Sequence, residues 1–371
     1  MSNRTKQLCS LGQSVWYDFI RRDMLRTGGL EQLVESGVTG VTSNPAIFEK
    51  AIAGSTEYDE ALVALAGREL DIETLFESLA IEDIQGASDV LRPVHDQTGC
   101  RDGFVSLEVS PELADDTAGT VHAARRLWKA VDRPNLMMKV PGTDAGFPAI
   151  ETLISEGINV NVTLLFSLEA YEKAVNAFLA GLEHRKKNGD DLSRVASVAS
   201  FFVSRVDTAV DRWIDEKGKS GDASLAALKG KAAVANAKLA YEIFGNIFTG
   251  DRFEALDGAQ RQRIVWASTS TKNPAYRDVL YVEELIGRDT VNTVPPDTLA
   301  AFEEHGEVRL TLTEGLDEAR RLLRRLGEAG IDFDAVTDTL LMEGVEAFKK
   351  PYRSLLAELE AKCSRLLAER S

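Results

Sequence analysis

About eight short apolar runs, separated by stretches of helical pattern, constrain the fold of this 371-residue chain more than any other feature. Several of them, such as LMMKV at 136–140 and IVWAS at 264–268, are nearly continuous in apolar residues, as parallel strands buried on both faces are. The runs lie at 14–18, 40–43, 104–109, 136–140, 160–165, 195–200, 264–268 and 291–294. Because strands that alternate with helices form parallel sheets, the sequence predicts an α/β protein.

The number of runs predicts a single closed (β/α)8 barrel, a TIM barrel, with an open doubly wound sheet as the alternative. Helical spacing of apolar residues is clearest at 117–131 and 167–182. Extra helices are expected within 51–100 and 217–257, together with a helical C-terminal tail from 316 to 371, whereas residues 1–11 are expected to be a frayed lead-in. Since no repeat or Pro/Gly/Ser-rich linker divides the chain, residues 1–371 are predicted to form one domain.

The charge and the scattered cysteines and histidines argue against several classes of function. A formal net charge of −16 repels polyanions, so a nucleic-acid partner is not expected, although a small phosphorylated substrate needs only one or two cations. The 3 cysteines and 4 histidines are far apart and form no CxxC or HExxH motif, so no metal site is expected. Without a long apolar run or an apolar leader, we expect no membrane partner and a cytoplasmic location.

Polar side chains end or interrupt the apolar runs near their C-terminal ends. They are Asp18, Asn44, Glu108, Lys139, Asn161, Thr163, Ser200 and Ser268. In a closed barrel, the C-terminal ends of the strands meet at one mouth, and catalytic residues lie there. We therefore expect these side chains to converge, although each one alone has an ordinary structural explanation.

Lys139 is the most informative of these residues because it lies inside an apolar run. Burial disfavours the charged form of an amine and so favours a neutral nucleophile that can attack a ketone. The alternative is a lysine that extends to solvent at a strand end. Glu108 can hold a water and move protons, or can be an ion-pair partner of Lys139. Asp18 can take a proton from a substrate hydroxyl, or can cap a helix.

The remaining candidates suit a hydroxyl-rich, phosphorylated ligand. Asn44 and Asn161 can both donate and accept hydrogen bonds, although Asn44 precedes Pro45 and can equally form a turn. Arg205 follows the run at 195–200 and is a candidate phosphate ligand, with an ordinary solvated arginine as the alternative.

Several segments resemble the transaldolase family, and the similarity covers nearly the whole chain. The string GINVNVTLLFS is the most specific of them, and the last segment resembles the longer bacterial branch of the family. The segments are GVTGVTSNPAIF (37–48), VSLEVSP (105–111), LMMKVPGTDAG (136–146), GINVNVTLLFS (157–167), ASFFVSRVD (199–207) and WASTSTKNPAYRDVLYVEELIG (266–287). The resemblance implies a cofactor-free class I aldolase barrel that moves a dihydroxyacetone unit between sugar phosphates in the non-oxidative pentose phosphate pathway.

The resemblance also implies a role for each matched residue. Lys139 in LMMKVPG corresponds to the Schiff-base lysine, and Asp18 in VWYDF to the general acid/base that handles the C4 hydroxyl. Glu108 and Thr163 correspond to the pair that holds the catalytic water. The groups that bind the dihydroxyacetone hydroxyls and the phosphate correspond to Asn44, Asn161, Ser200 and Arg205.

The phosphate end departs from the family pattern. Shorter transaldolases have an arginine soon after the Ala-Ser of the seventh strand, where this chain has ASTSTK from Ala267 to Lys272. Lys272 is expected to supply the second positive charge, with Ser268 or Ser270 donating hydrogen bonds. Because lysine binds as a point charge where arginine binds through two parallel N–H groups, the pose of the phosphate is expected to differ.

Two other functions remain as alternatives. Related aldolases, which are much shorter, have Gln in place of Glu108 and Tyr in place of Phe202, so these two residues favour transfer over simple cleavage. A fructose-6-phosphate-type aldolase that releases free dihydroxyacetone is the nearest alternative. A non-catalytic sugar-phosphate-binding barrel is the other, with its extra helices and tail serving an interface. The sequence does not determine the oligomeric state, and a homodimer is one possibility.

Overall fold

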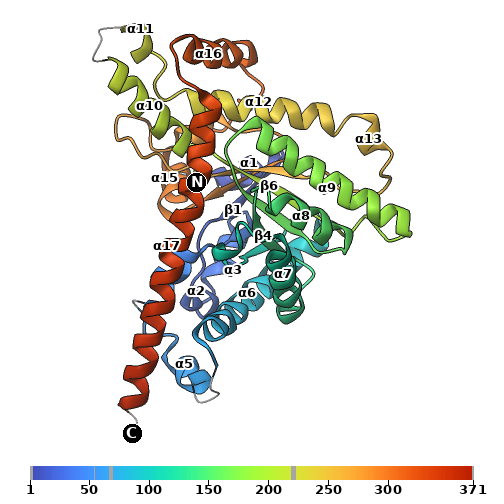
Figure 1. The fold of residues 1–371 in the computed structure, drawn as a ribbon, viewed down its shortest axis with the longest axis vertical. Helices are drawn as coiled ribbons and strands as arrows, with labels where there is room; N and C mark the ends of the chain where they lie inside the picture. Colours follow the sequence, from blue (N-terminus) through green and yellow to red (C-terminus); the bar gives the residue numbers. More distant parts are fainter. Residues whose placement is uncertain (1–2, 54, 67–69, 219–222, 370–371) are drawn as a thin grey trace.

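The computed structural model describes residues 3–53, 55–66, 70–218 and 223–369, and its centre is a closed barrel of eight parallel strands (Figure 1). Each strand pairs with the next in the sequence, and β8 pairs with β1. The predicted (β/α)8 barrel is confirmed, and the open doubly wound sheet is wrong. Each predicted run overlaps one strand: β1 (Gln13–Tyr17), β2 (Val38–Thr42), β3 (Val105–Glu108), β4 (Leu136–Pro141), β5 (Val160–Leu165), β6 (Ser197–Phe202), β7 (Arg263–Ala267) and β8 (Thr290–Val294).

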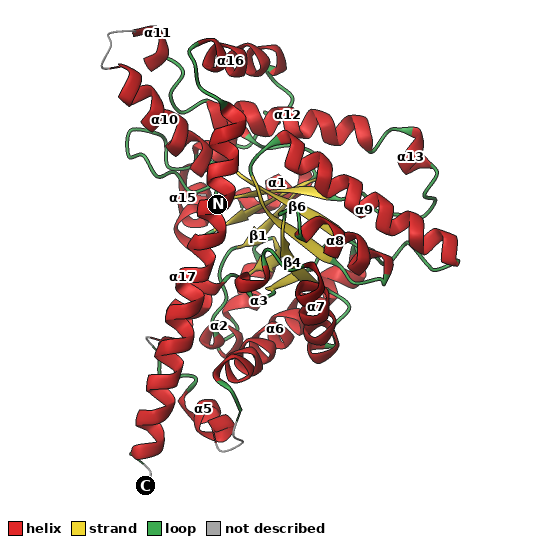
Figure 2. Ribbon diagram, in the orientation of Figure 1, coloured by secondary structure: helices red, strands yellow, loops and turns green. Residues whose placement is uncertain are grey.

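Helices surround the strands on the outside of the barrel (Figure 2). Within the described ranges, none of them combines the length and the apolar character that crossing a membrane requires. Those that connect successive strands are α2 (Arg22–Arg26), α3 (Gly29–Glu35), α4 (Pro45–Ala53), α5 (Asp59–Ala66), α6 (Ile72–Gln97), the 3-10 turn η1 (Pro111–Leu113), α7 (Thr117–Val131), α8 (Gly146–Ser155), α9 (Leu168–Asn188), α10 (Ser204–Gly218), α11 (Ala223–Ala226), α12 (Ala232–Ile247), α13 (Asp251–Glu254) and α14 (Leu280–Glu284). The last strand is followed by α15 (Pro296–His305), α16 (Leu316–Glu328) and α17 (Phe333–Ala368).

The two clearest predicted helices begin at residues that cap them. The Asp116 side chain accepts a hydrogen bond from the Gly119 amide at the start of α7, and Ser167 does the same for Ala170 at the start of α9. Such caps satisfy amides that have no partner within the first helical turn. The extra helices expected within 51–100 and 217–257 and the helical tail are also present.

The N-terminal segment differs from the expectation. Residues Arg4–Ser10 form the helix α1, so the predicted frayed lead-in is wrong for this part, and residues 1–2 lie outside the described residues. The Asn3 side chain caps α1 by accepting a hydrogen bond from the Lys6 amide. Glu303 on α15 accepts a hydrogen bond from the Thr5 amide at 2.6 Å, and Leu8 is buried. Asn3 was the sequence signal for this helix.

Strand register explains why the central polar residues meet. Glu108 on β3 is the register partner of Lys139 on β4, and Lys139 is the partner of Asn161 on β5. A separate apolar cluster, contributed by six strands or the residues next to them, fills the barrel interior with Trp16, Phe104, Met137, Ala196, Val198, Val265 and Val291. Because this interior is packed, the polar residues at the strand ends lie at or just beneath the mouth.

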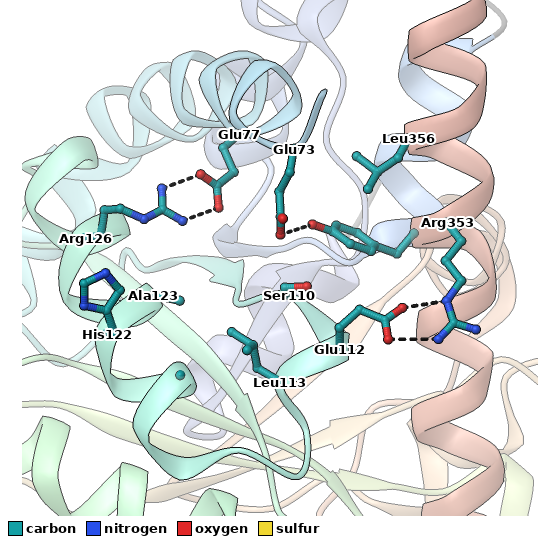
Figure 3. Close-up of a pocket in the computed structure, with 12 residues that line it drawn as sticks. Glu73, Glu77, Ser110, Glu112, Leu113, His122, Ala123, Arg126, Arg353 and Leu356 are labelled. Atoms are coloured by element: carbon teal, nitrogen blue, oxygen red, sulfur yellow. Dashed lines mark hydrogen bonds and ion pairs between the residues drawn. The ribbon is translucent and has the colours of Figure 1, made fainter. Parts of the chain in front are cut away.

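The helix α17 runs along one side of the barrel (Figure 1). Gly344 permits a close approach to β5, because a Cβ atom there would lie 3.0 Å from the Leu164 side chain. About two turns further along, the Tyr352 hydroxyl donates to Glu73 on α6 at 2.6 Å, and Arg353 forms two hydrogen bonds with Glu112 on η1 (Figure 3). These bonds fix α17 against the rim of the barrel.

Candidate active site

A cavity of about 210 Å³ lies at the C-terminal ends of the strands. Its wall contains every site residue expected from the sequence except Glu108 and Asn161, which lie behind it. The expected residues on the wall are Asp18, Asn44, Lys139, Thr163, Ser200, Arg205, Ser268, Ser270 and Lys272. The predicted convergence on one mouth is therefore observed.

Lys139 is buried in this cavity rather than extended to solvent, so the alternative of a solvent-exposed lysine is wrong. Its Nζ donates to the Ser43 carbonyl oxygen at 3.1 Å and lies 3.4 Å from Glu108 Oε2. The side chains of Lys139 and Glu108 are only 6% and 7% exposed. Two buried ionisable groups in contact stabilise each other's charged form, while burial opposes it.

Burial raises the pKa of Glu108 to about 7, although the charge of Lys139 acts in the opposite direction. The negative charge of Asp18 raises this pKa further. Glu108 is thus both an ion-pair partner of Lys139 and a carboxyl group that can give and take a proton near neutral pH. The two interpretations of Glu108 from the sequence are compatible in this geometry.

Asp18 follows β1 directly and faces the same cavity. Thr42 Oγ1 donates to Asp18 Oδ1 at 2.7 Å. Burial raises the pKa of Asp18, and Lys139 opposes this shift more strongly than the bond from Thr42 does. The next helix has Arg21 at its N-cap, so helix capping by Asp18 is wrong.

Thr163 has a buried hydroxyl that faces the cavity without a hydrogen-bond partner among the described residues. The pairing of β5 with β6 is irregular between Val162 and Leu165, and Leu164 has a φ of 62°. This local distortion is costly for a non-glycine residue, and such residues cluster at functional sites. An unpartnered buried hydroxyl beside the Lys139 strand is suited to hold a water or a substrate oxygen.

Asn161 and Ser200 form a chain of hydrogen bonds beneath the cavity. Asn161 Nδ2 donates to Ser106 Oγ at 3.0 Å, and Ser200 Oγ donates to Asn161 Oδ1 at 2.7 Å. Asn161 is fully buried and its amide is already bonded at both ends, so its present contact is with Ser200 rather than with the cavity. Asn44 lines the cavity but also caps α4 by accepting from the Ile47 amide at 3.0 Å, which supports the turn interpretation.

Two cations form the other end of the cavity. Arg205 lies at the start of α10 and is half-buried, and no ion pair is formed by Arg205 or Lys272 within the described part of the chain. Reduced contact with solvent lowers the pKa of both groups, and Arg205 lowers that of Lys272 further. Lys272 Nζ lies 2.6 Å from Ser270 Oγ. The charges of Glu343 and Asp18 act on Arg205 and Lys272 from a distance, but two cations without an ion pair among the described residues suit a phosphate group.

A hydrogen bond joins the segments that carry these cations. Tyr276, four residues after Lys272, donates its hydroxyl proton to Asp211 Oδ2 at 2.6 Å, and Asp211 lies on the same helix as Arg205. Ser268, which follows β7, has a φ of 55°, so the chain turns sharply there to bring Ser270 and Lys272 over the cavity. The loop after β7 is therefore held against α10 near Tyr276, and against β8 by Thr269, whose hydroxyl donates to Asn292 Oδ1 at 2.9 Å.

Phe348 is the main residue of the site that sequence reasoning missed. It comes from α17, is 7% exposed, lines the cavity, and places its ring centroid 5.3 Å from Lys139 Nζ. An aromatic face at this distance attracts a cation and excludes water. Phe202 lines the cavity as well, as expected, with its ring 5.6 Å from the Arg205 guanidinium carbon.

Residues 15–359 match the family described as Transaldolase/Fructose-6-phosphate aldolase. The chain belongs to the transaldolase family. It is 49% identical to a transaldolase of Thiobacillus denitrificans, with 96% of this chain and 99% of the relative covered. It is 47% identical to transaldolase 2 of a Nostoc species, with 97% of each chain covered, and 48% identical to transaldolase 1 of Streptomyces coelicolor, with 95% and 93% covered.

The description of the family includes two activities, transfer and cleavage, and residues at the mouth of the barrel are expected to decide between them. Glu108 and Phe202 are the two residues for which the sequence predicts a difference: Glu108 contacts Lys139 at the reacting end, whereas Phe202 lines the cavity beside Arg205. Within the described ranges, no group of three or more His, Cys, Asp or Glu side chains is placed to bind a metal ion.

Proposed function

We propose that this chain is a transaldolase that works through a Schiff base on Lys139. It takes a dihydroxyacetone unit from a ketose phosphate, such as sedoheptulose 7-phosphate or fructose 6-phosphate, and gives it to glyceraldehyde 3-phosphate or erythrose 4-phosphate. The observation that carries the proposal is a buried amine, Lys139, in contact with the carboxyl of Glu108 in a cavity whose other end has two cations that form no ion pair with the residues that the structure describes. The named activity of relatives that are 47–49% identical supports it.

In the first half of the cycle, Lys139 Nζ attacks C2 of the ketose phosphate as a neutral amine. Glu108, with a pKa of about 7, passes protons through a water held with Thr163, so that the carbinolamine loses water and becomes an imine. The bond formed is Nζ–C2, and the bond broken is C2–O. The position of Glu108 beside Nζ suits both the proton that leaves the amine and the one that joins the departing oxygen.

In the second half, Asp18 removes the proton from the C4 hydroxyl of the bound ketose. The C3–C4 bond breaks, its electron pair moves into the protonated imine, and an aldose phosphate leaves. The dihydroxyacetone fragment stays bound to Lys139 as an enamine, which then attacks the aldehyde carbon of the acceptor, and Asp18 returns the proton. Donor and acceptor therefore never meet, and ping-pong kinetics are expected.

The walls of the cavity support transfer over loss of the fragment. Arg205 and Lys272 are placed to bind the phosphate of donor and acceptor in turn. Phe348 gives the reacting end an apolar cover that keeps bulk water away from the enamine, and Phe202 adds an apolar wall beside Arg205. Ser200, Thr163 and Asn44 line the same cavity as Lys139, and their hydroxyl and amide groups suit the hydroxyls of the dihydroxyacetone unit.

Reductive trapping tests the proposal directly. The chain is treated with borohydride in the presence of fructose 6-phosphate, and its peptides are analysed by mass spectrometry. We expect a reduced adduct on the peptide containing Lys139 and none when the sugar is left out. An adduct on another lysine, or no adduct in an active preparation, contradicts the assignment.

An aldolase that releases free dihydroxyacetone is the second candidate, because the family description includes that activity. Fructose 6-phosphate without an acceptor separates the two: a transaldolase stops after one turnover, whereas an aldolase continues to release dihydroxyacetone. A non-catalytic sugar-phosphate-binding barrel would show thermal stabilisation by sugar phosphate without an adduct or turnover. The cytoplasmic location is inferred from the sequence. The sequence does not determine the oligomeric state, and light scattering tests whether the chain forms a homodimer.

A further inference from the structure

A second cavity, of about 440 Å³, lies at the opposite end of the barrel from the mouth. It is formed by loops that lead into strands: Arg101 precedes β3, Arg263 begins β7, and Asp289 precedes β8. Phe253 on α13 completes the wall with an apolar ring. This cavity shares no residue with the substrate cavity, so the proposed reaction gives it no task.

The charge of this cavity resembles that of the substrate cavity, whose wall also carries three cations and one carboxylate. Three guanidinium groups, those of Arg101, Arg261 and Arg263, line it together with the single carboxylate of Asp289. Asp102 lies behind Arg263 at 3.4 Å and does not line the cavity. The chain as a whole carries a formal net charge of −16, so a cavity wall with an excess of positive charge is a local feature and not a reflection of composition.

One carboxylate is shared between two arginines. Arg101 Nη2 lies 3.0 Å from Asp289 Oδ1, and Arg261 Nη1 lies 3.1 Å from Asp289 Oδ2. Each guanidinium has five N–H donors and a planar shape that fits two oxygens at once, but each uses one nitrogen for Asp289. Both side chains remain open to solvent, at 66% and 43% exposed. Most of their donors are therefore available to a ligand.

Arg263 is held in place by hydrogen bonds and lines the cavity together with Arg101 and Arg261. Its Nη1 donates to Ser14 Oγ and its Nη2 donates to the Arg101 carbonyl oxygen, both at 2.7 Å, and its side chain is 12% exposed. A network that only held the loops together would be expected to pair each cation with its own carboxylate. Exposed ion pairs contribute little to stability, so the partial pairing of Arg101 and Arg261 is not explained by a stabilising role. Here Arg263, which is held by two hydrogen bonds, and Arg101 and Arg261, which share one carboxylate, line the same cavity.

We propose that this cavity binds a small molecule that carries two or more phosphate charges. Arginine forks match phosphate oxygens in geometry, and three of them provide the charge that a multiply charged phosphate needs. The volume lies within the range of about 300–1,000 Å³ that is typical of small-molecule sites. The Phe253 ring and Ala259 supply an apolar wall for the organic part of such a molecule.

Calorimetric titration with inorganic pyrophosphate at low ionic strength tests the site. The double variant Arg101→Gln/Arg261→Gln is expected to bind pyrophosphate at this site at least about tenfold more weakly than the unmodified chain. The matched control is Arg92→Gln/Arg125→Gln, which removes the same charge from two exposed arginines that are paired with Asp96 and Glu156 and line neither cavity, and it should titrate like the unmodified chain. Because the substrate cavity is intact in both variants, any binding of pyrophosphate there contributes equally to both. Equal titrations of all three proteins overturn the proposal, whatever the outcome of trapping at Lys139.

A second variant tests the proposal in the opposite direction and does not require loss of an arginine. Asp289→Asn removes the carboxylate that competes with the ligand, and asparagine tolerates the φ of 54° found at this position. We expect Asp289→Asn to bind pyrophosphate about tenfold more tightly, because both guanidiniums are then free of a counter-charge. Unchanged or weaker binding in this variant shows that the cluster is a structural ion-pair network and overturns the proposal.

Discussion

At the reacting end of the substrate cavity, Asp18, Glu108 and Lys139 are carried by β1, β3 and β4 or follow them directly, and they are bonded to protein groups already. At the phosphate end, Arg205 stands at a helix start and Lys272 on a loop, and neither forms an ion pair within the described residues. The barrel thus fixes the groups that make and break bonds, whereas a loop and a helix start provide the charge that recognises the substrate. Mutations at the two ends should therefore have different kinetic effects.

The largest effect is expected from Lys139→Ala at the reacting end. Without the amine no imine forms, so we expect turnover to fall on the order of 10⁴-fold or more in a coupled transfer assay. Lys238→Ala is the matched control, since Lys238 is also buried, donates to a carbonyl oxygen at 3.0 Å and lies 3.5 Å from a carboxylate, but faces another cavity. Comparable losses of turnover in both variants would mean that the loss reflects removal of a buried lysine and not removal of the reactive amine.

Glu108→Gln should lower kcat by about 10²- to 10⁴-fold, because glutamine cannot move protons. The pH profile of kcat/KM, which reports groups of the free enzyme, should have an inflection near 7 in the unmodified chain, from the pKa of Glu108, and that inflection should be absent in the variant.

The stability of the same pair of proteins provides a separate check of this pKa. The pKa of Glu108 is raised from 4.5 to about 7 in the folded chain, so the folded state keeps a proton that the unfolded state has lost. Relative to Glu108→Gln, the unmodified chain should therefore lose stability as pH rises from about 4.5 to 7 and then stay level. Denaturant unfolding at several pH values measures it, and a difference that does not change with pH contradicts the assigned pKa.

At the phosphate end, Arg205→Gln should raise KM for fructose 6-phosphate about ten- to a hundredfold with little change in kcat, and Lys272→Ala should have a smaller effect of the same kind. Fructose without phosphate serves as the control substrate, for which neither change should alter KM. A fall in kcat with unchanged KM would remove the distinction between the two ends.

Phe348→Ala should open the cover of the reacting end. We expect faster release of dihydroxyacetone in the absence of acceptor, together with a loss of about 3 kcal/mol in the free energy of unfolding from the lost packing. Phe348→Leu, which keeps an apolar cover, should restore most of the ratio of transfer to release. If both variants release the fragment equally, the cover is not what protects the enamine.

The smallest effect is expected from Tyr276→Phe, which removes only the hydroxyl that bonds Asp211. One hydrogen bond to a carboxylate contributes about 1–3 kcal/mol, part of which serves to hold the Lys272 loop, so we expect a severalfold rise in KM for phosphorylated substrates. Tyr241→Phe, which removes a hydroxyl bonded to the Arg288 carbonyl oxygen far from the mouth, is the control.

The sequence predicted the strands well because their pattern is a local property. LMMKV and VNVTLL are apolar enough to be buried whatever surrounds them, and β4 and β5 are indeed fully buried. The closed barrel in turn predicted that the polar residues at the strand ends meet at one mouth, because the C-terminal ends of all eight parallel strands lie on the same face. The direction of each polar side chain is less local: Asn161 points to Ser200 beneath the cavity, and no pattern indicated this.

Phe348 and α1 were missed for different physical reasons. Which turn of the long amphipathic α17 faces the mouth depends on bonds such as those of Tyr352 and Arg353 with α6 and η1, and none of these contacts is visible in the sequence. For α1, the signal was present in Asn3 but was outweighed by the polar composition of the segment. Contacts over long sequence separation limit the prediction in the first case, and an overlooked cap in the second.

The position of Phe348 near the end of the chain has a consequence for biosynthesis. A ribosome makes the strands of the barrel, with Asp18, Glu108 and Lys139, long before it makes α17. A nascent barrel can thus carry its reactive lysine, but the aromatic cover arrives only when the final helix has been translated and docked. Transfer of the dihydroxyacetone unit, rather than its release, should therefore require α17. A chain whose translation stops before α17 should release dihydroxyacetone instead of transferring it.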